Sequence, residues 1–373
     1  MNQKLLHTPE GVRDIYGDEC ARKLAVEDKL HRKLVSFGYE DIQTPTFEYF
    51  DVFSNEIGTT TSRELYKFFD KEGDTLVLRP DFTPSIARCA AKYFMEENVP
   101  IRFCYAGNTF TNTSHLQGKL KEVTQLGAEL IGDASVYADA EMIHLVIEAL
   151  LGSGLENFQI SIGQVEYFKG LCEEAGIDAD TELSLREYIS AKNYFAAEDL
   201  LLSAGVAEQT RKLLLTTTDM FGSPDALKEA KALVKNERSR QAIERLEQLY
   251  QVLTLYGSEK YISFDLGMLS KYRYYTGIIF KAYTYGIGDA IVKGGRYDGL
   301  LPHFGKEAPA IGFAVVVDDL LEALSRQQVK IDLPDAPRCL TYTTESFPQI
   351  LKEAQELGAQ GVSVRLCREK GEA

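Results

Sequence analysis

The strand-forming segments of this chain follow one another through short turns, and its helical segments are grouped between them. Two apolar runs, residues 66–69 and 75–78, flank a Lys-Glu-Gly-Asp turn that is typical of a hairpin. Further strand-like runs are predicted at residues 101–107, 122–132, 158–162, 261–267, 274–283 and 289–293. This order favours an α+β fold, with a mostly antiparallel sheet flanked by helices, over a doubly wound parallel sheet.

Two segments differ from this pattern and suggest the domain organisation. Residues 170–256 are charged, helical and poor in strand signals, which predicts a helical insertion in a core of residues 1–326. Residues 327–373 read as a C-terminal α/β segment with a strand, a helix and a strand. Because about 40 residues are too few for a comfortable core of their own, we expect a remnant, a truncated domain or a docked appendage.

Charge and hydropathy exclude some functions. The chain has 41 basic and 56 acidic residues, a formal net charge of −15. Nucleic acid is therefore not an expected partner, since neutralisation of phosphates supplies most non-specific affinity for it. No apolar run approaches the roughly 20 residues that span a bilayer, and the first residues do not resemble a signal peptide. We expect a cytoplasmic protein without a membrane partner.

The six cysteines are scattered along the chain, without a CxxC pair and without clustering beside the five histidines. This spacing argues against a disulfide framework or a zinc site and favours reduced thiols. The common phosphate-loop, dinucleotide, zinc-protease and serine-nucleophile motifs are also absent. We therefore expect neither a cofactor nor a metal.

Polar residues stand on one face of the predicted strand at residues 122–132. Two-residue periodicity places Gln125, Gly127 and Glu129 on the same face, so that an amide and a carboxylate flank a position without a side chain. Such a surface can hold a small molecule that carries an amine or an imidazole. The alternative is a solvent-exposed polar face with a glycine bulge.

A second polar group lies at a strand-to-helix junction. Thr83 can cap the following helix through its hydroxyl, with Pro84 at the first helical position, while Asp81 can receive an ammonium group. The alternative is a helix cap with an incidental acid. Farther along, residues 274–277 (Tyr-Tyr-Thr-Gly) and 294–299 (Gly-Gly-Arg-Tyr-Asp-Gly) combine tyrosines with glycines, which indicates either turns or a surface where a ligand touches the backbone.

Taken together and in order, these segments resemble the catalytic core of class II aminoacyl-tRNA synthetases, and among them histidyl-tRNA synthetase. The resemblance extends over roughly residues 5–325. The matching segments are residues 8–14 (the family's N-terminal signature), 38–45 (motif 1, the dimerisation element), 78–83 with 110–132 (motif 2 and its loop), 310–314 (motif 3), and 274–277 with 294–298 (the histidine-pocket motifs).

The phosphate side of that family's site departs from the pattern. An active synthetase has arginines at the positions of Thr111, Ser270 and Asp319, and an acid at the position of Thr113. Because each such cation contributes several kcal/mol to a charged transition state, the resemblance implies that adenylation is lost and that the chain has no catalytic residues. Arg273 also stands where the family has an acid.

The amino-acid side is retained. The residues that match positions around the bound histidine are Asp81, Thr83, Gln125, Glu129, Tyr274, Tyr275 and Tyr297, with Asp81 in place of the usual glutamate. The resemblance therefore implies that the histidine pocket is retained although the catalytic residues are lost.

This combination resembles the regulatory subunits of ATP phosphoribosyltransferase. The resemblance implies a homodimer within a hetero-oligomer, a short-form catalytic subunit as partner, a role in the first step of histidine biosynthesis, and feedback regulation by histidine. Three alternatives stay open: a working histidyl-tRNA synthetase with unusual motifs, a free-standing module that senses histidine or tRNA, and a paralogue that uses the pocket for another reaction.

Overall fold

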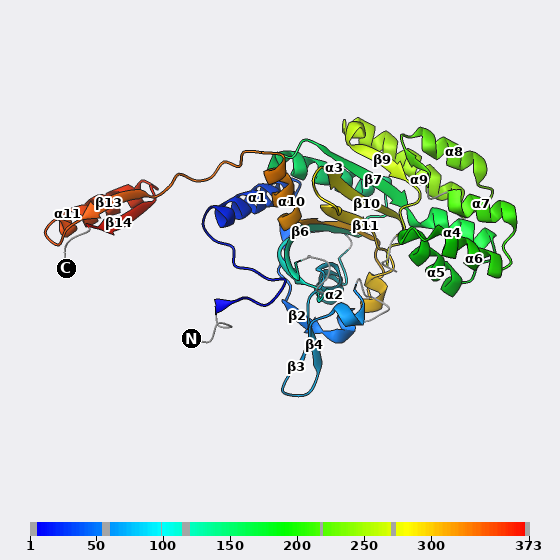
Figure 1. The fold of residues 1–373 in the computed structure, drawn as a ribbon, viewed down its shortest axis with the longest axis horizontal. Coiled ribbons are helices and arrows are strands. Elements are labelled where there is room, and N and C mark those ends of the chain that lie inside the picture. Colours follow the sequence, from blue (N-terminus) through cyan, green and yellow to red (C-terminus); the bar gives the residue numbers. More distant parts are fainter. Residues whose placement is uncertain are drawn as a thin grey trace. The chain divides into compact units, whose positions relative to one another are not determined.

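A computed structural model describes residues 6–53, 60–97, 99–113, 120–216, 219–269 and 274–369 of the chain (Figure 1). The chain divides into two compact units, Met1–Lys330 and Ile331–Ala373, and each is described by itself. None of the helices in the described ranges combines the length and the apolar character that crossing a lipid bilayer requires.

A nine-stranded sheet forms the centre of the first unit, in the order β1-β5-β6-β12-β11-β10-β7-β9-β8. Its strands are β1 (Glu40–Asp41), β5 (Ile101–Phe110), β6 (Glu122–Ile131), β7 (Phe158–Gln164), β8 (Phe221–Gly222), β9 (Ile262–Asp265), β10 (Ile278–Thr284), β11 (Val292–Arg296) and β12 (Ala310–Val316). Within this sheet, only the described pairs β1 with β5 and β7 with β9 are parallel. The predicted antiparallel α+β architecture is therefore confirmed.

Two predicted strand positions differ from the structure. Strand β10 begins at Ile278, so Tyr274 and Tyr275 precede it. Strand β11 extends to Arg296, so Gly294 and Gly295 lie inside a central strand and not in a turn. The reason is close packing, since a Cβ at Gly295 would lie 2.7 Å from the ring of Tyr275 and 2.7 Å from the carbonyl oxygen of Ile278.

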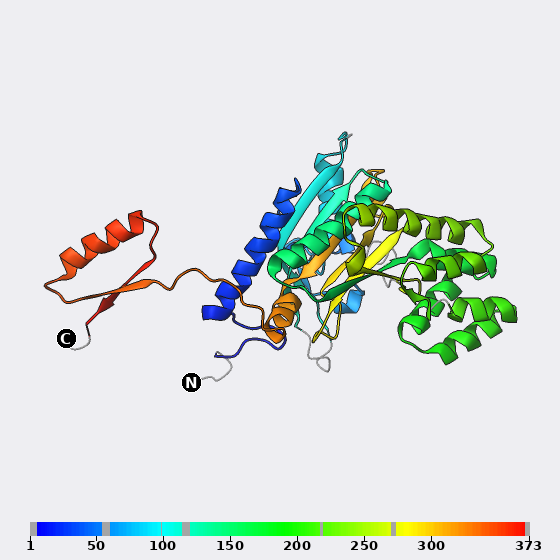
Figure 2. The ribbon, with the colours of Figure 1, turned by 90° about the horizontal axis from the view of Figure 1, so that it is seen from above.

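Helices α1 (Gly17–Ser36), α3 (Val136–Ser153) and α10 (Val317–Arg326) pack on one face of the sheet (Figures 1 and 2). Helix α1 buries Val26, Leu30 and Leu34, which recur at helical spacing. Helix α2 (Thr83–Tyr93) covers the opposite face, where its Ile86 and Ala90 pack with Phe103 of β5. The two faces of β5 thus meet different helices, because alternate residues of a strand point to opposite sides.

The predicted insertion is helical. Its helices are α4 (Val165–Glu174), α5 (Ala179–Ser190), α6 (Tyr194–Ser203), α7 (Glu208–Thr216), α8 (Asp225–Leu233) and α9 (Glu237–Leu255). They gather beyond β7 and β9, shown in green in Figures 1 and 2. Helix α9 joins them to the core, since it packs against α3, α4 and β7.

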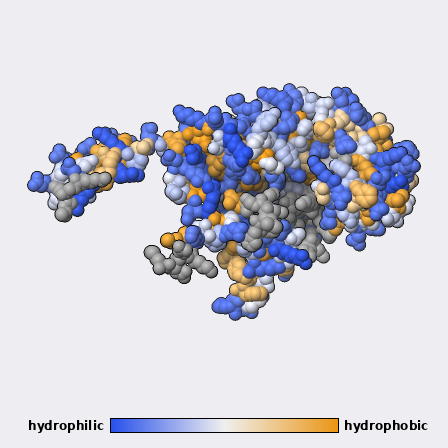
Figure 3. All heavy atoms as spheres, in the orientation of Figure 1, coloured by the Kyte–Doolittle hydropathy of each residue, from blue (hydrophilic) through white to orange (hydrophobic). Residues whose placement is uncertain are grey.

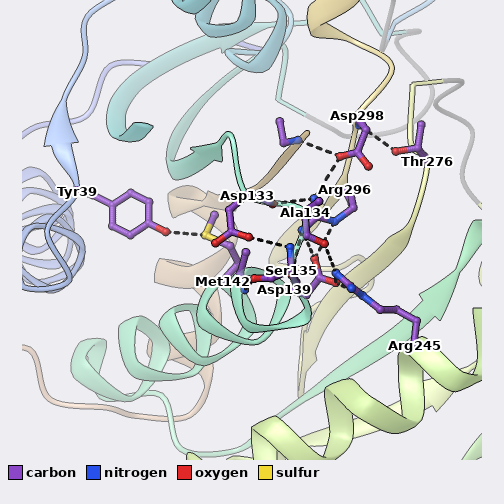
Figure 4. A network of polar contacts seen from close by, with 12 residues as sticks. Tyr39, Asp133, Ala134, Ser135, Asp139, Met142, Arg245, Thr276, Arg296 and Asp298 are labelled. Carbon is purple, nitrogen blue, oxygen red and sulfur yellow. Dashed lines mark hydrogen bonds and ion pairs between the residues drawn. The ribbon is translucent and has the colours of Figure 1, made fainter. Parts of the chain in front are cut away.

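A buried ion cluster ties the insertion to the core (Figure 4). Asp139 of α3 is fully buried, and its Oδ1 accepts hydrogen bonds of 2.9 and 2.5 Å from the guanidinium group of Arg296 on β11. Its Oδ2 lies 2.6 Å from the guanidinium group of Arg245 on α9. Arg296 also donates to Asp298, whose carboxylate accepts from the backbone N–H of Ala310. One carboxylate therefore holds a central strand and the insertion together.

A small antiparallel sheet stands apart from the main one, with the strand order β2-β4-β3. Its strands are β2 (Phe47–Tyr49), β3 (Lys67–Phe69) and β4 (Thr75–Leu78), and the pairing of β3 with β4 confirms the predicted hairpin. Four aromatic side chains on β2 and β3 are exposed: Phe47, Tyr49, Phe68 and Phe69. Figure 3 shows apolar surface gathered over this small sheet. Short 3-10 helices occur at Phe50–Phe53, Ser62–Glu64, Glu259–Tyr261 and Leu301–Phe304.

The C-terminal unit contains two parallel strands, β13 (Arg338–Tyr342) and β14 (Val364–Arg368), joined through α11 (Phe347–Ala359). A disulfide links Cys339 to Cys367. The expectation of reduced thiols is wrong for this pair. Sequence spacing could not reveal it, because the two cysteines are 28 positions apart and approach only through the register of the two strands.

We expect this disulfide to carry much of the stability of the C-terminal unit. Among the unit's described residues Leu340 is the one buried hydrophobic side chain, so packing contributes little. Reduction should remove about 3–4 kcal/mol, the entropic stabilisation expected for a closed loop of this length. Hydrogen exchange with and without reductant measures this loss as faster exchange of the backbone amides of β13 and β14. The double variant Cys339→Ser, Cys367→Ser should exchange like the reduced protein. Equal protection in both states would contradict the expectation.

Candidate functional site

A cavity of about 900 Å³ lies on the α2 face of the sheet. Strands β6, β11 and β12 form its floor, the start of α2 and the tyrosines before β10 form one side, and α5 of the insertion forms another. This volume is within the range of small-molecule pockets. The cavity has room for a polar ligand larger than one amino acid.

The structure gathers the residues predicted for a histidine pocket around this cavity. Six of them line it: Asp81, Thr83, Gln125, Tyr274, Tyr275 and Tyr297. They come from four separate segments of the chain, which the sheet and α2 bring together. The alternative of a solvent-exposed polar face on β6 is wrong, because Gln125 faces the cavity and Glu129 is 1 % exposed.

Glu129 lies directly beneath the lining residues. Its Oε1 accepts a 2.8 Å hydrogen bond from the Thr83 hydroxyl, and its Oε2 accepts a 2.5 Å bond from the Tyr297 hydroxyl. The predicted helix cap by Thr83 is therefore wrong, because this hydroxyl is engaged by Glu129 and makes no cap hydrogen bond. Gly312 on β12 leaves the space that the Glu129 carboxylate occupies, and any Cβ there would collide with Oε2. The carboxylate thus fixes the positions of two residues on the cavity wall.

Burial raises the pKa of Glu129 to about 8, although the hydrogen bonds from Tyr297 and Thr83 oppose the shift. The nearby charge of Asp81 also raises it. Near neutral pH the Glu129 carboxyl is thus largely protonated, and Asp81 is the neighbouring acid that lines the cavity. A cationic ligand would favour the ionised form of Glu129 and so release a proton on binding.

We expect stability to fall as pH rises because of Glu129. A carboxyl whose folded-state pKa exceeds its unfolded value stabilises the fold fully below about 4.5 and loses that contribution as pH rises to about 8. The expected difference between pH 5 and pH 8.5 is about 4 kcal/mol. Glu129→Gln keeps the neutral shape and should flatten this dependence in urea titrations. Parallel curves for the two proteins would show that Glu129 is not the responsible group.

Gln125 offers a hydrogen-bond acceptor to a ligand. Its side-chain Oε1 is buried and has no hydrogen-bond partner within the described part of the chain. A buried carbonyl without a donor is unfavourable by about 1–3 kcal/mol, and a ligand N–H can remove that penalty. Together with the Asp81 carboxyl, which lines the same cavity, this makes the cavity suited to a ligand with an ammonium or imidazole N–H.

The predicted positions of lost catalytic groups are only partly at the cavity. Thr111 lines it, whereas Thr113 has a buried hydroxyl but is not among the lining residues. Asp319 on α10 lies outside the lining, with a pKa raised by burial and by the neighbouring Asp289. Ser270 lies outside the described residues, and so does Arg273.

Sequence reasoning missed one wall of the site. Residues of α5 line the cavity although they belong to the insertion: Leu183, Arg186, Glu187 and Ser190. They resemble ordinary surface residues of an amphipathic helix, so no sequence signal distinguished them. Lys293 was also missed, although a charged residue directly before the Gly-Gly pair was a usable signal.

The two missed cations do not restore a phosphate site by themselves. Arg186 pairs with Glu182 on the same helix, and the Lys293 ammonium lies 3.3 Å from Asp289. Each positive charge is thus matched by a neighbouring carboxylate. Among the described residues, hydrogen-bonding side chains line the cavity, and Arg186 is the one arginine in its lining.

Comparisons with known proteins find similar sequences over most of the chain. The model of the histidyl-tRNA synthetase family matches residues 11–320. An ATP phosphoribosyltransferase regulatory subunit of Acetivibrio thermocellus is 40% identical over 361 residues, 97% of this chain and 86% of the relative. One from a Thermoanaerobacter species is 40% identical over 362 residues, 97% of this chain and 94% of the relative.

Solved structures of similar proteins have the same fold. A protein of Bacillus halodurans described as an ATP phosphoribosyltransferase regulatory subunit/histidyl-tRNA synthetase superposes with a TM-score of 0.89 at 32% identity, covering 99% of this chain and 94% of that one. A histidyl-tRNA synthetase from a Nostoc species has a TM-score of 0.80 at 21% identity, covering 98% and 86%. The second likeness concerns the fold alone.

Proposed function

Because the chain belongs to the histidyl-tRNA synthetase family, and within it to the ATP phosphoribosyltransferase regulatory subunits, we propose that it binds and activates a short-form catalytic subunit and makes its rate respond to histidine. The chain is a regulatory subunit for the first step of histidine biosynthesis and not the catalyst of that step. A cytoplasmic location is part of the proposal.

The observation that carries the proposal is the asymmetry of the cavity. The amino-acid end keeps Asp81, Gln125 and the Glu129 cluster, whereas Thr111 occupies the position of the motif 2 arginine. A site that holds an amino acid without activating it is suited to sensing. Feedback then requires that histidine bind two states of the assembly with different affinities, since equal affinities shift no equilibrium.

The contacts of the assembly are also part of the proposal. We place a homodimer contact at motif 1, residues 38–45, within a larger complex with the catalytic subunit. The exposed aromatic side chains of β2 and β3 support a protein contact next to this segment, because clustered exposed apolar groups commonly mark interaction surfaces. The acidic charge of the chain speaks against tRNA as the partner.

Reconstitution with a short-form ATP phosphoribosyltransferase tests the function. We expect a stable complex in size-exclusion chromatography, higher turnover of ATP and phosphoribosyl pyrophosphate than for the catalytic subunit alone, and inhibition by added histidine. Absence of both a complex and an effect on turnover would contradict the proposal. Activation without an effect of histidine would retain the activating role and reject the sensing role.

An exchange assay tests the alternative of an active synthetase. Because the described cavity has no motif 2 or motif 3 arginine, we expect no histidine-dependent exchange of pyrophosphate into ATP above background. The histidyl-tRNA synthetase of a comparable organism serves as the positive control. Exchange at a rate near that of the control would make the chain an enzyme and overturn the reading of Thr111 and Asp319.

A further inference from the structure

A histidine, an aspartate and a cysteine meet on the face of the sheet opposite the cavity. His31 belongs to α1, Asp41 to β1, and Cys104 to β5. Their ligating atoms all lie within 4.8 Å of one another. The expectation that no cysteine clusters with a histidine was correct along the sequence but is wrong in space.

We propose that these three side chains form a binding site for a divalent transition-metal ion of the zinc type. Imidazole nitrogen, carboxylate oxygen and thiolate sulfur are the donors that Zn²⁺ accepts in proteins. Three protein ligands leave the fourth tetrahedral position to water. The site is separate from the cavity, so this inference does not depend on the proposed function.

The distances suit such an ion after a small movement. The His31 Nε2 lies 2.7 Å from the Asp41 Oδ1, and the Cys104 Sγ lies 3.6 Å from the same oxygen. In a tetrahedral zinc site neighbouring donors are about 3.5 Å apart, as bond lengths near 2.0–2.3 Å require. The imidazole and the carboxylate must separate, and both side chains have room to do so, being 36% and 65% exposed.

The scaffold holds the donors in place. Asp41 and Cys104 are register partners in the parallel pair β1 and β5, and the backbone N–H of Ile42 donates to the Cys104 carbonyl oxygen. Helix α1 packs on β5 and is fixed by the buried Leu30 beside His31. Cys104 is fully buried, whereas the side chains of His31 and Asp41 are partly exposed, so an ion would approach the thiol from the side of these two residues.

Cobalt binding to the full chain, with the Cys339–Cys367 disulfide intact, tests the proposal. We expect one equivalent of Co²⁺ to produce visible bands and a thiolate-to-cobalt charge-transfer band, both removed by adding Zn²⁺. Cys104→Ser should remove the charge-transfer band. His31→Gln and Asp41→Asn change exposed side chains without disturbing the core, and each should weaken binding at least tenfold.

A matched variant and a folding check distinguish loss of the metal site from loss of the fold. Cys89→Ser changes a partly buried thiol on α2 and should leave the spectrum unchanged. Circular dichroism confirms that each variant is folded before titration. The proposal is overturned if the wild type shows no charge-transfer band, if the band survives in Cys104→Ser, or if Cys89→Ser removes it. It is also overturned if His31→Gln and Asp41→Asn both bind Co²⁺ as the wild type does.

Discussion

Asp139→Asn is expected to destabilise the first unit by about 3–5 kcal/mol, the largest loss of stability that we expect from a single isosteric change. The substitution preserves the shape of the side chain but removes its charge. Arg296, with 6% of its side chain exposed, then keeps a buried positive charge without its principal counter-ion. Asp298 cannot replace it, because its contact with Arg296 is longer, at 3.2 Å, and it also binds the backbone N–H of Ala310.

Two further variants separate charge from packing in this cluster. Arg245→Met removes a guanidinium group whose side chain is 27% exposed, and should lower stability by only about 1 kcal/mol. Adding Arg296→Met to Asp139→Asn removes the isolated buried charge and should recover part of the loss. Urea unfolding followed by circular dichroism provides the measurement. A loss below about 1 kcal/mol in Asp139→Asn would show that water solvates the Arg296 charge or that another group neutralises it.

The same cluster shows what the sequence could and could not predict. The hairpins, the antiparallel sheet and the helical insertion followed from patterns that are local in sequence, such as the turn at residues 70–74 and the apolar spacing of α1. Asp139 resembles any acid in the first turn of a helix. Its partners stand 106 and 157 positions away, so only the folded chain reveals the contacts.

The residues of the candidate site could likewise be predicted only in part. Gln125 and Glu129 were identified because the period of a strand puts them on one face, and Asp81 because it stands beside a helix start. Thr83 was predicted to cap the helix. Its hydroxyl instead donates a hydrogen bond to Glu129, which lies 46 positions farther along the chain. The α5 wall was missed because its lining residues carry no local signal. Local patterns predict elements and faces, whereas tertiary contacts decide which faces meet.

Asp81→Asn is expected to weaken histidine binding about 10- to 100-fold, because a charged hydrogen-bond acceptor contributes about 1.5–3 kcal/mol to such a contact. The expected contact is between the Asp81 carboxyl and the ammonium group of histidine. Glu129 can compensate only in part near neutral pH, because with a pKa of about 8 its carboxyl must first lose a proton to carry a negative charge. Isothermal titration calorimetry on the reconstituted complex and on the free chain measures the affinity.

Glu187→Gln is the matched control for this change. It removes the same charge from the α5 wall of the same cavity, so a general electrostatic effect would weaken binding in both variants. We expect Glu187→Gln to bind histidine within about threefold of the wild type, since a charge that contacts no ligand group contributes little through solvent. Equal losses in both variants would place the ammonium group elsewhere in the cavity.

The enzymatic readout distinguishes sensing from activation. With Asp81→Asn in the complex, the histidine concentration for half-inhibition should rise by the same factor as the dissociation constant, because binding and inhibition are linked through one coupling free energy. The turnover without histidine should stay at the wild-type level, since Asp81 lies inside the cavity and not on the exposed β2 and β3 surface. If histidine binding weakens but inhibition does not, the inhibition arises from histidine bound at a second site, and the cavity is not the regulatory site.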